Sequence, residues 1–559
     1  MVRRIFIALA LTLCTTCGGP PPAEHVAQRS AILITLDTTR ADAFDAFGGA
    51  HHVTPVLDGL AAESVCYRFA HSVAPLTLPA HTSMFTGLYP PQHTVRGNGP
   101  AMVPEGLTLL AERAAAAGAQ TAAFIGGLSL DRAYGIARGF ETWTQPKQDP
   151  TCTNGLVSSR PASAVVADAR AWFAKRDRSR PFFLWVHVFD AHARYEPPRS
   201  FLDLAGGDPY LGEIATYDAA LGLLIADLRR EKVLDEALLV VLADHGEARG
   251  DHGEDTHGCQ TFESTLHIPF FVRHPDGARK GEHTDEPACS VDVAPTMLEW
   301  LRLPPLAAGD CDGVSLLHPV PEGRGSYFEA YSGWARFGWS PLVGWVDREA
   351  KFVYSTKPRL FRLVDDPGEE HDVLAQAPRE AERGRERVRW IFERGPAKAI
   401  RPRLASISSD AIAALGYGEN GEFEPEYPDP FTVTDLPPPF ECLDEYNEFA
   451  DAQNLNILGK HAEAASKLER VIAANPRCLD ALDEWAASLI ELKQWQRAVE
   501  VLQDRVRRPP ERTSTHQKLV RCYTELGDKE KTREHALRVL DLLIEASERV
   551  SRGDFQPSL

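Results

Sequence analysis

Acidic and histidine side chains stand at the ends of two apolar runs in this chain. Asp37 follows the run at 31–36, and Asp244 and His245 follow the run at 237–243. Carboxylate oxygen together with imidazole nitrogen suits a divalent cation such as Ca²⁺, Mn²⁺ or Zn²⁺. The pattern predicts one divalent metal ion held by Asp37, Asp244 and His245. An aspartate after a strand is by itself more often a helix cap, and the Asp244–His245 pair is what favours a metal.

These residues need a scaffold that brings distant parts of the sequence to one edge. Short apolar runs have the character of strands buried on both faces, and helical patterns separate them. The runs are 31–36, 181–189, 237–243 and 268–272, and the helical patterns are 107–117, 162–175 and 217–230. This alternation predicts an α/β fold with a mostly parallel sheet and helices on both faces. Ligands of such sheets bind beyond the carboxyl ends of the strands, where Asp37 and Asp244 stand.

The C-terminal part repeats with a period of 34 residues. Leucine recurs at this spacing at Leu458, Leu492 and Leu526. The period is typical of tetratricopeptide (TPR) helical hairpins, so an all-α TPR-like domain is predicted at 441–545, with a tail at 546–559. Because each hairpin can bury its apolar face only against a neighbour, the stack either docks on the preceding domain or binds a protein or peptide partner.

Prolines and acidic residues crowd the stretch before these repeats. They predict a linker or surface strap at 401–440, which leaves an enzyme-sized domain at 30–400. A chain of 559 residues, 43% apolar and 25% charged, is long enough for several globular domains. Its net charge of −19 argues against nucleic acid as a partner.

The first residues are typical of an export signal. A short apolar run at 5–13 has the length of a signal-peptide core and is too short to span a membrane. Residues 1–17 are therefore predicted to be a signal peptide and 18–29 a tether. The segment resembles a bacterial lipoprotein signal, which implies a lipid at Cys17 or Cys14 as the chain's contact with a membrane. Plain secretion is the alternative, and both place the protein in the periplasm or cell envelope.

Four segments together resemble the sulfatase family of the alkaline phosphatase superfamily. They are Asp-Thr-Thr-Arg at 37–40, the segment 74–90, Asp-His-Gly-Glu at 244–247 and the segment 327–367, in the order and spacing of that family. The resemblance covers about residues 30–375. It implies an α/β fold, a buried divalent metal, and a nucleophile at the start of a helix that attacks sulfur or phosphorus.

The nucleophile position departs from the family pattern. The sulfatase signature is Cys or Ser, any residue, Pro, a small residue and Arg, whereas this chain has Thr77, Leu78, Pro79, Ala80 and His81. Because threonine carries a methyl group on Cβ, its oxidation would not give formylglycine, and none is expected. Thr77 resembles the nucleophile of phosphodiesterases, phosphonate monoester hydrolases and phosphoethanolamine or phosphoglycerol transferases of this superfamily. The resemblance implies that Thr77 is both metal ligand and nucleophile. The alternative is a helix-capping hydroxyl in a non-catalytic relative.

Histidines supply the remaining roles. His192 lies in a segment that resembles the family's pocket, and its near-neutral pKa suits a proton donor to the leaving group. The resemblance implies that His257 holds a non-bridging oxygen. His81 and Asn98 are candidates for binding substrate at the pocket wall, while Asp251 and Glu254 are expected to form a charged loop.

These expectations leave three functions open. The first is a metal-dependent hydrolase of sulfate or phosphate esters. A phosphoryl or sulfuryl group esterified to Thr77 could be released only by a second attack on its phosphorus or sulfur atom, which favours phosphate diesters or phosphonate esters as substrates. The second is a transferase, in which an acceptor alcohol replaces water. The third is a catalytically degenerate sulfatase-like binding protein that presents its TPR repeats to a partner.

Overall fold

The computed structural model describes residues 29–98, 102–147, 159–307, 309–396, 427–508 and 511–552. The predicted signal peptide and all of the tether except Arg29 lie outside these residues, so export and lipid attachment stay predictions. Within the described residues, no helix combines the length and the apolar character that a membrane crossing requires.

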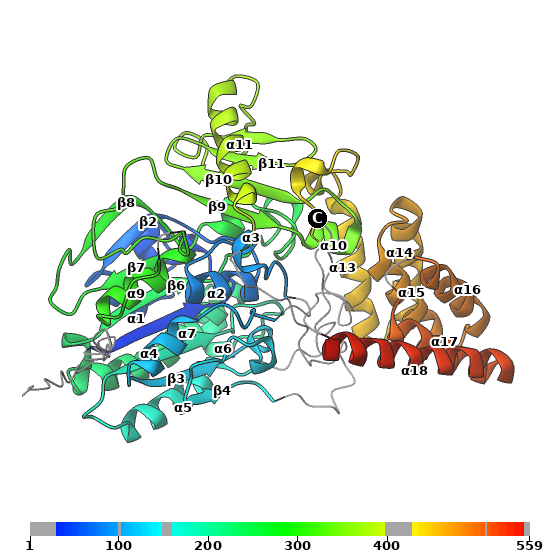
Figure 1. Ribbon diagram of the computed structural model, residues 1–559, viewed down its shortest axis with the longest axis horizontal. Coiled ribbons are helices and arrows are strands. Elements are labelled where there is room, and N and C mark those ends of the chain that lie inside the picture. The colour runs from blue at the N-terminus through cyan, green and yellow to red at the C-terminus, as the bar shows by residue number, and fades with distance from the viewer. Residues whose placement is uncertain are drawn as a thin grey trace, which may run out of the picture.

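The centre of the molecule is an eight-stranded sheet in the order β4-β3-β5-β1-β6-β7-β2-β8 (Figure 1). Its strands are β1 (Ala31–Leu36), β2 (Val65–His71), β3 (Gln120–Ile125), β4 (Thr142–Thr144), β5 (Phe182–Val188), β6 (Leu238–Ala243), β7 (Phe270–Arg273) and β8 (Glu282–Cys289). Neighbouring strands are parallel except for β7, which is antiparallel to both β6 and β2. The predicted mostly parallel sheet is confirmed, and all four predicted strands belong to it.

Strand β1 lies between β5 and β6, and this position assembles the site. Leu36, the last residue of β1, is in register with Val188 of β5 and Ala243 of β6. Every residue of β1 and β6 is buried, which explains their uninterrupted apolar sequences. The residues that follow these strands therefore emerge together at one edge of the sheet.

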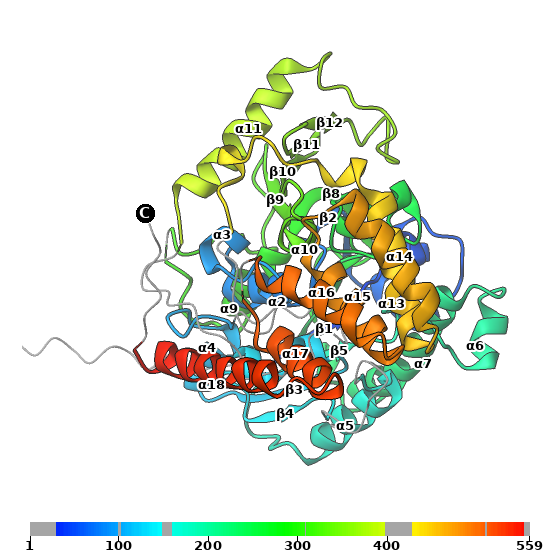
Figure 2. The ribbon, with the colours of Figure 1, turned by 90° about the vertical axis from the view of Figure 1, so that its right-hand side faces the viewer.

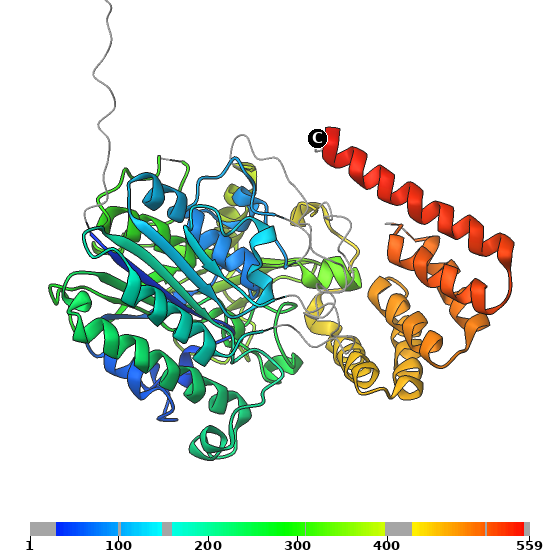
Figure 3. The same ribbon diagram turned by 90° about the horizontal axis from the view of Figure 1, so that it is seen from below.

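Helices cover both faces of the sheet (Figure 3). One face carries α1 (Pro55–Ala61), α5 (Ala162–Lys175) and α7 (Pro209–Arg230), and the other carries α2 (Thr77–Thr86), α4 (Leu110–Ala116) and α9 (Val293–Trp300). Shorter helices are α3 (Pro90–His93), α6 (Arg199–Leu204), α8 (Glu263–Leu266) and α10 (Ser332–Phe337). Helix α5 has the predicted bounds, while α7 begins eight residues earlier than its apolar pattern indicated.

A second, antiparallel sheet follows, and none of its strands was predicted within the domain at 30–400. It consists of β9 (Gly325–Ala330), β10 (Leu342–Asp347), β11 (Lys351–Tyr354) and β12 (Arg359–Phe361), and α11 (Pro378–Glu393) packs on it. The described part of the predicted linker lies against this sheet. Ser340 N–H donates to Pro437 O (2.8 Å), and the Thr356 hydroxyl donates to Leu436 O (2.8 Å).

The C-terminal region is helical, and each helix packs on the next (Figure 2). It comprises α13 (Leu443–Ile457), α14 (His461–Ala474), α15 (Leu479–Glu491), α16 (Trp495–Val506), α17 (Thr513–Glu525) and α18 (Lys529–Arg552). Its first helices share an apolar cluster with Cys259, Phe337 and Trp339 of the preceding part. The region therefore docks on the α/β part of the chain.

Candidate active site

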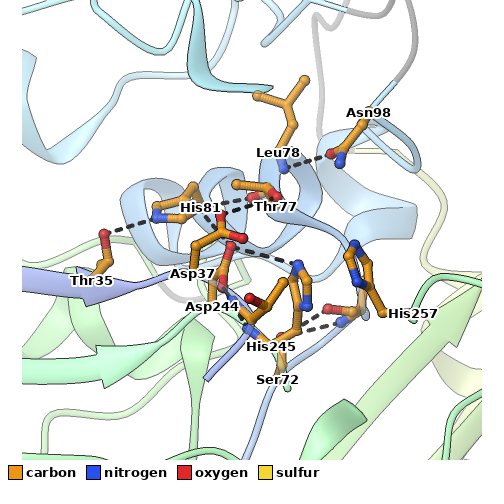
Figure 4. A network of polar contacts seen from close by, with 12 residues as sticks. Thr35, Asp37, Ser72, Thr77, Leu78, His81, Asn98, Asp244, His245 and His257 are labelled. Carbon is orange, nitrogen blue, oxygen red and sulfur yellow. Dashed lines mark hydrogen bonds and ion pairs between the residues drawn. The ribbon is translucent and has the colours of Figure 1, made fainter. Parts of the chain in front are cut away.

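The three predicted metal ligands lie together at the carboxyl edge of the sheet (Figure 4). Asp37 follows β1, and Asp244 and His245 follow the adjacent β6. All three side chains are buried, and one ligand atom from each lies within 4.8 Å of those of the other two. The parallel pairing of β1 with β6 brings together residues that are more than 200 positions apart in the sequence.

Each of the three residues offers one buried atom that has no hydrogen-bond partner. These atoms are Asp37 Oδ1, Asp244 Oδ2 and His245 Nε2. The other side-chain polar atoms of Asp244 and His245 are held by hydrogen bonds. Asp244 Oδ1 accepts from the backbone N–H groups of Thr38 (3.2 Å) and His245 (2.8 Å). His245 Nδ1 donates to Gly246 O (2.9 Å). Buried polar atoms are rarely left unpaired, so three of them on residues whose ligand atoms lie within 4.8 Å of one another fit a divalent cation.

The electrostatics of the two carboxyl groups agree with this fit. Burial raises the pKa of Asp37 to about 7, and burial together with the nearby Asp37 raises the pKa of Asp244 to about 6. The protein alone therefore disfavours two negative charges here. A divalent cation removes that disadvantage, because its charge stabilises both ionised carboxylates.

Thr77 is the first residue of α2, and its side chain faces the ligands. Its hydroxyl donates to Asp37 Oδ2 (3.4 Å), which also accepts from His187 Nε2 (3.2 Å). The N-cap position belongs to Leu76 and has no side-chain capping bond. Thr77 therefore does not cap the helix, and the role of a structural capping hydroxyl does not fit its contacts.

Asn98 and His81, predicted at the pocket wall, both hold the start of α2. Asn98 Oδ1 accepts from the Leu78 N–H (2.8 Å). His81 Nδ1 donates to Thr77 O (2.8 Å), and its Nε2 accepts from the Thr35 hydroxyl (3.1 Å). With both ring nitrogens engaged, His81 supports the nucleophile helix, and these contacts favour that role over direct contact with substrate. Asn98 Nδ2 is buried without a partner and stays available to a ligand.

His257 lies close to the ligands and is oriented by a carboxylate. Its ring centroid is 4.6 Å from that of His245 and 5.1 Å from that of His192. His257 Nδ1 donates to Glu247 Oε1 (2.9 Å), and Glu247 Oε2 accepts from the Tyr195 hydroxyl (3.1 Å). Burial raises the pKa of Glu247 to about 7. The pair gives His257 a fixed orientation beside the metal ligands.

His192 presents a buried nitrogen at the same place. Its Nδ1 donates to Ala193 O (2.8 Å), its ring stacks on Phe189 with centroids 4.5 Å apart, and its Nε2 has no partner. Burial lowers the pKa of His192 to about 3, so the imidazole is neutral in the protein alone. A bound anion would raise that pKa and favour a proton on Nε2.

Three buried residues of the site make contacts that the sequence did not predict. Glu247 was part of a motif but was not recognised as the partner of His257, and His187 was not recognised as a donor to Asp37. Glu254 was expected in a charged loop, and this expectation was wrong. It is buried, and its Oε1 accepts from the N–H groups of Cys259 (2.8 Å) and Gln260 (3.3 Å). Asp251 is half exposed and pairs with Arg40 (2.6 Å), as expected for a charged loop.

Comparisons with known proteins agree with this architecture. The sulfatase family model matches residues 29–303. The arylsulfatase of Clostridium perfringens is 21% identical over 429 residues, which cover 60% of this chain and 88% of that protein. The phosphonate monoester hydrolase of Agrobacterium radiobacter has a similar structure, with a TM-score of 0.54 and 20% identity over 66% of this chain and 95% of that one.

A further similar structure is a complex with its substrate D-glucosamine-2-N,6-O-disulfate. Its TM-score is 0.55 and its identity 15%, over 71% of this chain and 100% of that one. Residues 29–303, which the sulfatase family model matches, contain the eight-stranded sheet, Thr77 and the three candidate metal ligands. This part of the chain is similar in sequence to a sulfatase and in fold to a phosphonate monoester hydrolase.

Proposed function

We propose that this protein is a metal-dependent hydrolase of monoanionic phosphorus esters, namely phosphate diesters or phosphonate monoesters, with Thr77 as the nucleophile. One observation carries the proposal. The buried Thr77 hydroxyl lies at the start of α2, 3.4 Å from Asp37 Oδ2, beside three unpaired ligand atoms. A hydroxyl in that position can attack an ester that is held at the same ion.

The charges of the site favour a substrate with one negative charge. The charged groups that act most strongly on Asp37 and Asp244 are carboxyl and imidazole groups, with no lysine or arginine among them. The two carboxylates balance the two positive charges of one divalent ion. A phosphate monoester dianion would then add an excess of negative charge to a buried site, which is costly. Diesters and phosphonate monoesters carry a single charge.

The reaction takes two displacements at phosphorus. In the first, Thr77 Oγ1 bonds to phosphorus and its proton passes to Asp37 Oδ2, while the bond from phosphorus to the leaving oxygen breaks and that oxygen takes a proton, for which His192 is the proposed donor. In the second, the oxygen of a water molecule bonds to phosphorus and gives a proton back to His192, while the bond from phosphorus to Thr77 Oγ1 breaks and Oγ1 regains the proton from Asp37. A divalent ion, when bound, supplies Lewis acidity toward the phosphoryl oxygens and the Thr77 hydroxyl.

The preference for phosphorus over sulfur rests on the single hydroxyl of Thr77. A covalent ester on Thr77 can be released only by a second attack on the central atom. Metal ions and preorganised donors stabilise that displacement well at phosphorus. Sequence similarity to sulfatases favours sulfate esters as substrates of this chain. The similarity of its fold to a phosphonate monoester hydrolase is compatible with attack on either sulfur or phosphorus.

The test is a panel of 4-nitrophenyl esters that share one leaving group. The purified protein is loaded separately with Mn²⁺, Zn²⁺ or Ca²⁺ and assayed on a diester, a phenylphosphonate, a phosphate monoester and a sulfate. We expect kcat/KM for the diester or the phosphonate to exceed that for the other two by at least about tenfold, which is about 1.4 kcal/mol. Thr77→Ser retains the hydroxyl and should retain activity, whereas Thr77→Val should lose it. Faster sulfate turnover would overturn the proposal, and product diverted to an added alcohol would indicate a transferase.

We further propose that the C-terminal helices are a TPR array. The 34-residue period corresponds to one helical hairpin, and three hairpins follow one another in the described residues. Export and lipid attachment at Cys17 also stay a proposal, supported by the N-terminal sequence alone. Its test is the distribution of a Cys17→Ala variant between membrane and soluble fractions of a bacterial host, where wild type should be in the membrane fraction.

A further inference from the structure

The C-terminal helical region contacts the loop that carries His257. Residues 246–260 follow the metal ligands, and the outer side of this loop faces α13. The Tyr446 hydroxyl is hydrogen-bonded to Thr256 Oγ1 (2.9 Å), and Asn447 Nδ2 donates to Gly253 O (2.8 Å). Two consecutive residues of α13 therefore hold two points of the loop.

The path from Tyr446 to the site is short. Thr256 directly precedes His257, and the carbonyl oxygen of Thr256 accepts from the N–H of Ala248 (2.7 Å). Ala248 in turn directly follows Glu247, the carboxylate that accepts from His257 Nδ1 (2.9 Å). The two limbs of the loop are thus joined by one backbone and one side-chain hydrogen bond. Tyr446 anchors Thr256, the residue that accepts the backbone bond and directly precedes His257.

Tyr446 itself is held firmly by its surroundings. It belongs to the apolar cluster that joins the two parts of the chain, with Cys259, Phe337, Trp339, Phe449 and Leu468 among its members. The buried ion pair of Arg336 on α10 with Asp480 on α15 (3.2 Å) crosses the same boundary. An anchor of this kind can restrain a loop whose regular structure is limited to one 3-10 turn at Asp251–Gly253.

We propose that Tyr446 is a positioning residue of the hydrolase: its hydroxyl, acting through Thr256, keeps His257 against Glu247 in the productive orientation. The C-terminal helices are then part of the catalytic apparatus and not only a surface for a partner. This inference rests on the proposed function, because it assigns His257 a role in catalysis. The restraint that Tyr446 places on residues 246–260 does not depend on bound substrate.

The first test separates the hydroxyl from the ring. Tyr446→Phe keeps the packing of the aromatic ring and removes the bond to Thr256, and Thr256→Val removes it from the other side. Each single variant is expected to lower kcat by about tenfold with KM and bound metal unchanged, and the double variant to lower it no further. The control is Tyr523→Phe, which removes a hydroxyl bonded to Gln503 Nε2 (2.8 Å) within the helical stack and should leave kcat unchanged.

The second test is hydrogen exchange of peptides from residues 246–260 in the metal-free protein without substrate. Exchange is expected to be faster in Tyr446→Phe than in wild type and Tyr523→Phe. A kcat of Tyr446→Phe within twofold of wild type, additive losses in the double variant, or unchanged exchange would each overturn the inference. If wild type hydrolyses none of the esters, the proposed function fails, and the exchange rates still decide whether Tyr446 orders the loop.

Discussion

Asp244 divides its two carboxylate oxygens between the backbone and the candidate ion. Oδ1 accepts hydrogen bonds from two backbone N–H groups, those of Thr38 and His245, while Oδ2 has no hydrogen-bond partner. A side chain fixed through one oxygen presents the other in a constant direction, which is what a metal ligand requires. His245 is held in the same way through Nδ1 and leaves Nε2 open.

The Asp244→Asn variant tests this division. The amide keeps the size of the side chain but removes the negative charge from the ligand position, so we expect bound divalent metal to fall to background in elemental analysis and ester hydrolysis to disappear. The control is Asp251→Asn, which changes a half-exposed acid of the neighbouring loop and should retain both. Full metal content in Asp244→Asn with an unchanged circular dichroism spectrum would remove Asp244 from the site.

At the scale of single residues, sequence reasoning was most successful where chemistry and strand ends coincide. Asp37, Asp244 and His245 could be grouped because parallel strands end at one edge of a sheet. The supporting contacts of His81 and Asn98 could not be foreseen, because hydrogen-bond directions depend on side-chain conformations that spacing does not fix. Glu254 was expected in a charged loop, and only the folded backbone shows its carboxylate turned inward onto two N–H groups.

At the scale of elements, three helices of the C-terminal region end in the same way. The residue two positions after α13, α15 and α17 has left-handed backbone torsion: Gly459 (φ 73°), Lys493 (φ 57°) and Gly527 (φ 76°). These positions are 34 residues apart, so they are the same position of the repeat. Glycine adopts this conformation without strain, whereas the Cβ of lysine is crowded in it.

Lys493→Gly should therefore stabilise the protein. Relief of the left-handed strain is worth about 1 kcal/mol, partly offset by the greater freedom of glycine in the unfolded chain, so we expect the unfolding free energy to rise by up to about 1 kcal/mol in urea titrations. Lys467→Gly, in the middle of α14, is the matched control and should lower stability by about 1 kcal/mol. A Lys493→Gly protein less stable than wild type would contradict this account of the turn.

The contact of α18 with the turn before α17 predicts a pH dependence of stability. Glu511 accepts hydrogen bonds from Arg538 of α18 (2.6 and 2.9 Å) and from His516 (2.8 Å), and these bonds, that of Arg538 first, lower its pKa to about 2. Because the folded-state pKa lies below the unfolded one, the stabilisation is fully present above about pH 5 and is lost as the pH falls toward 2.

Glu511→Gln should accordingly be less stable than wild type at pH 7, with a difference that shrinks between pH 5 and pH 3 in urea titrations. Glu491→Gln changes a more exposed ion pair with Arg521 on the same stack and is expected to show little difference at either pH. A Glu511→Gln deficit that stays constant down to pH 3 would show that the carboxylate is not the source of the stabilisation.

The elements with strong patterns were predicted well from the sequence. Buried strands such as β1 and β6 are continuous apolar runs, and α5 has the bounds that its apolar spacing predicts. Strands β11 and β12, of four and three residues, are too short to show an alternating pattern, so these two strands of the second sheet could not be predicted. The 34-residue period predicted helical hairpins but could not show that their first helix rests on the loop beside the metal ligands.

At the scale of the whole molecule, the α/β part and the helical region share a core. Phe449 of α13 is buried, and its ring centroid is 5.5 Å from that of Phe337 on α10. Because the boundary is an apolar cluster, unfolding of one part exposes the core of the other. We expect a single calorimetric transition for the intact chain.

Phe449→Ala tests that coupling. Loss of a buried phenylalanine costs about 3–5 kcal/mol, and the midpoint of the whole transition should fall. Leu519→Ala, in the core of the later helices, is the comparison, since it lies in a cluster made only of residues from the helical region. Two separate transitions in wild type, with only one of them lowered by Phe449→Ala, would show that the two parts unfold independently.

The most direct test of the central claim is the chemical state of Thr77 during turnover. Metal-loaded enzyme is mixed with an excess of the 4-nitrophenyl diester or phosphonate, quenched in acid within a turnover, digested and examined by mass spectrometry. The account predicts a peptide containing Thr77 with the added mass of the phosphoryl ester, and its absence from Thr77→Val treated alike. A substrate-derived group on another residue, or a Thr77→Val enzyme that turns over as fast as wild type, would contradict it.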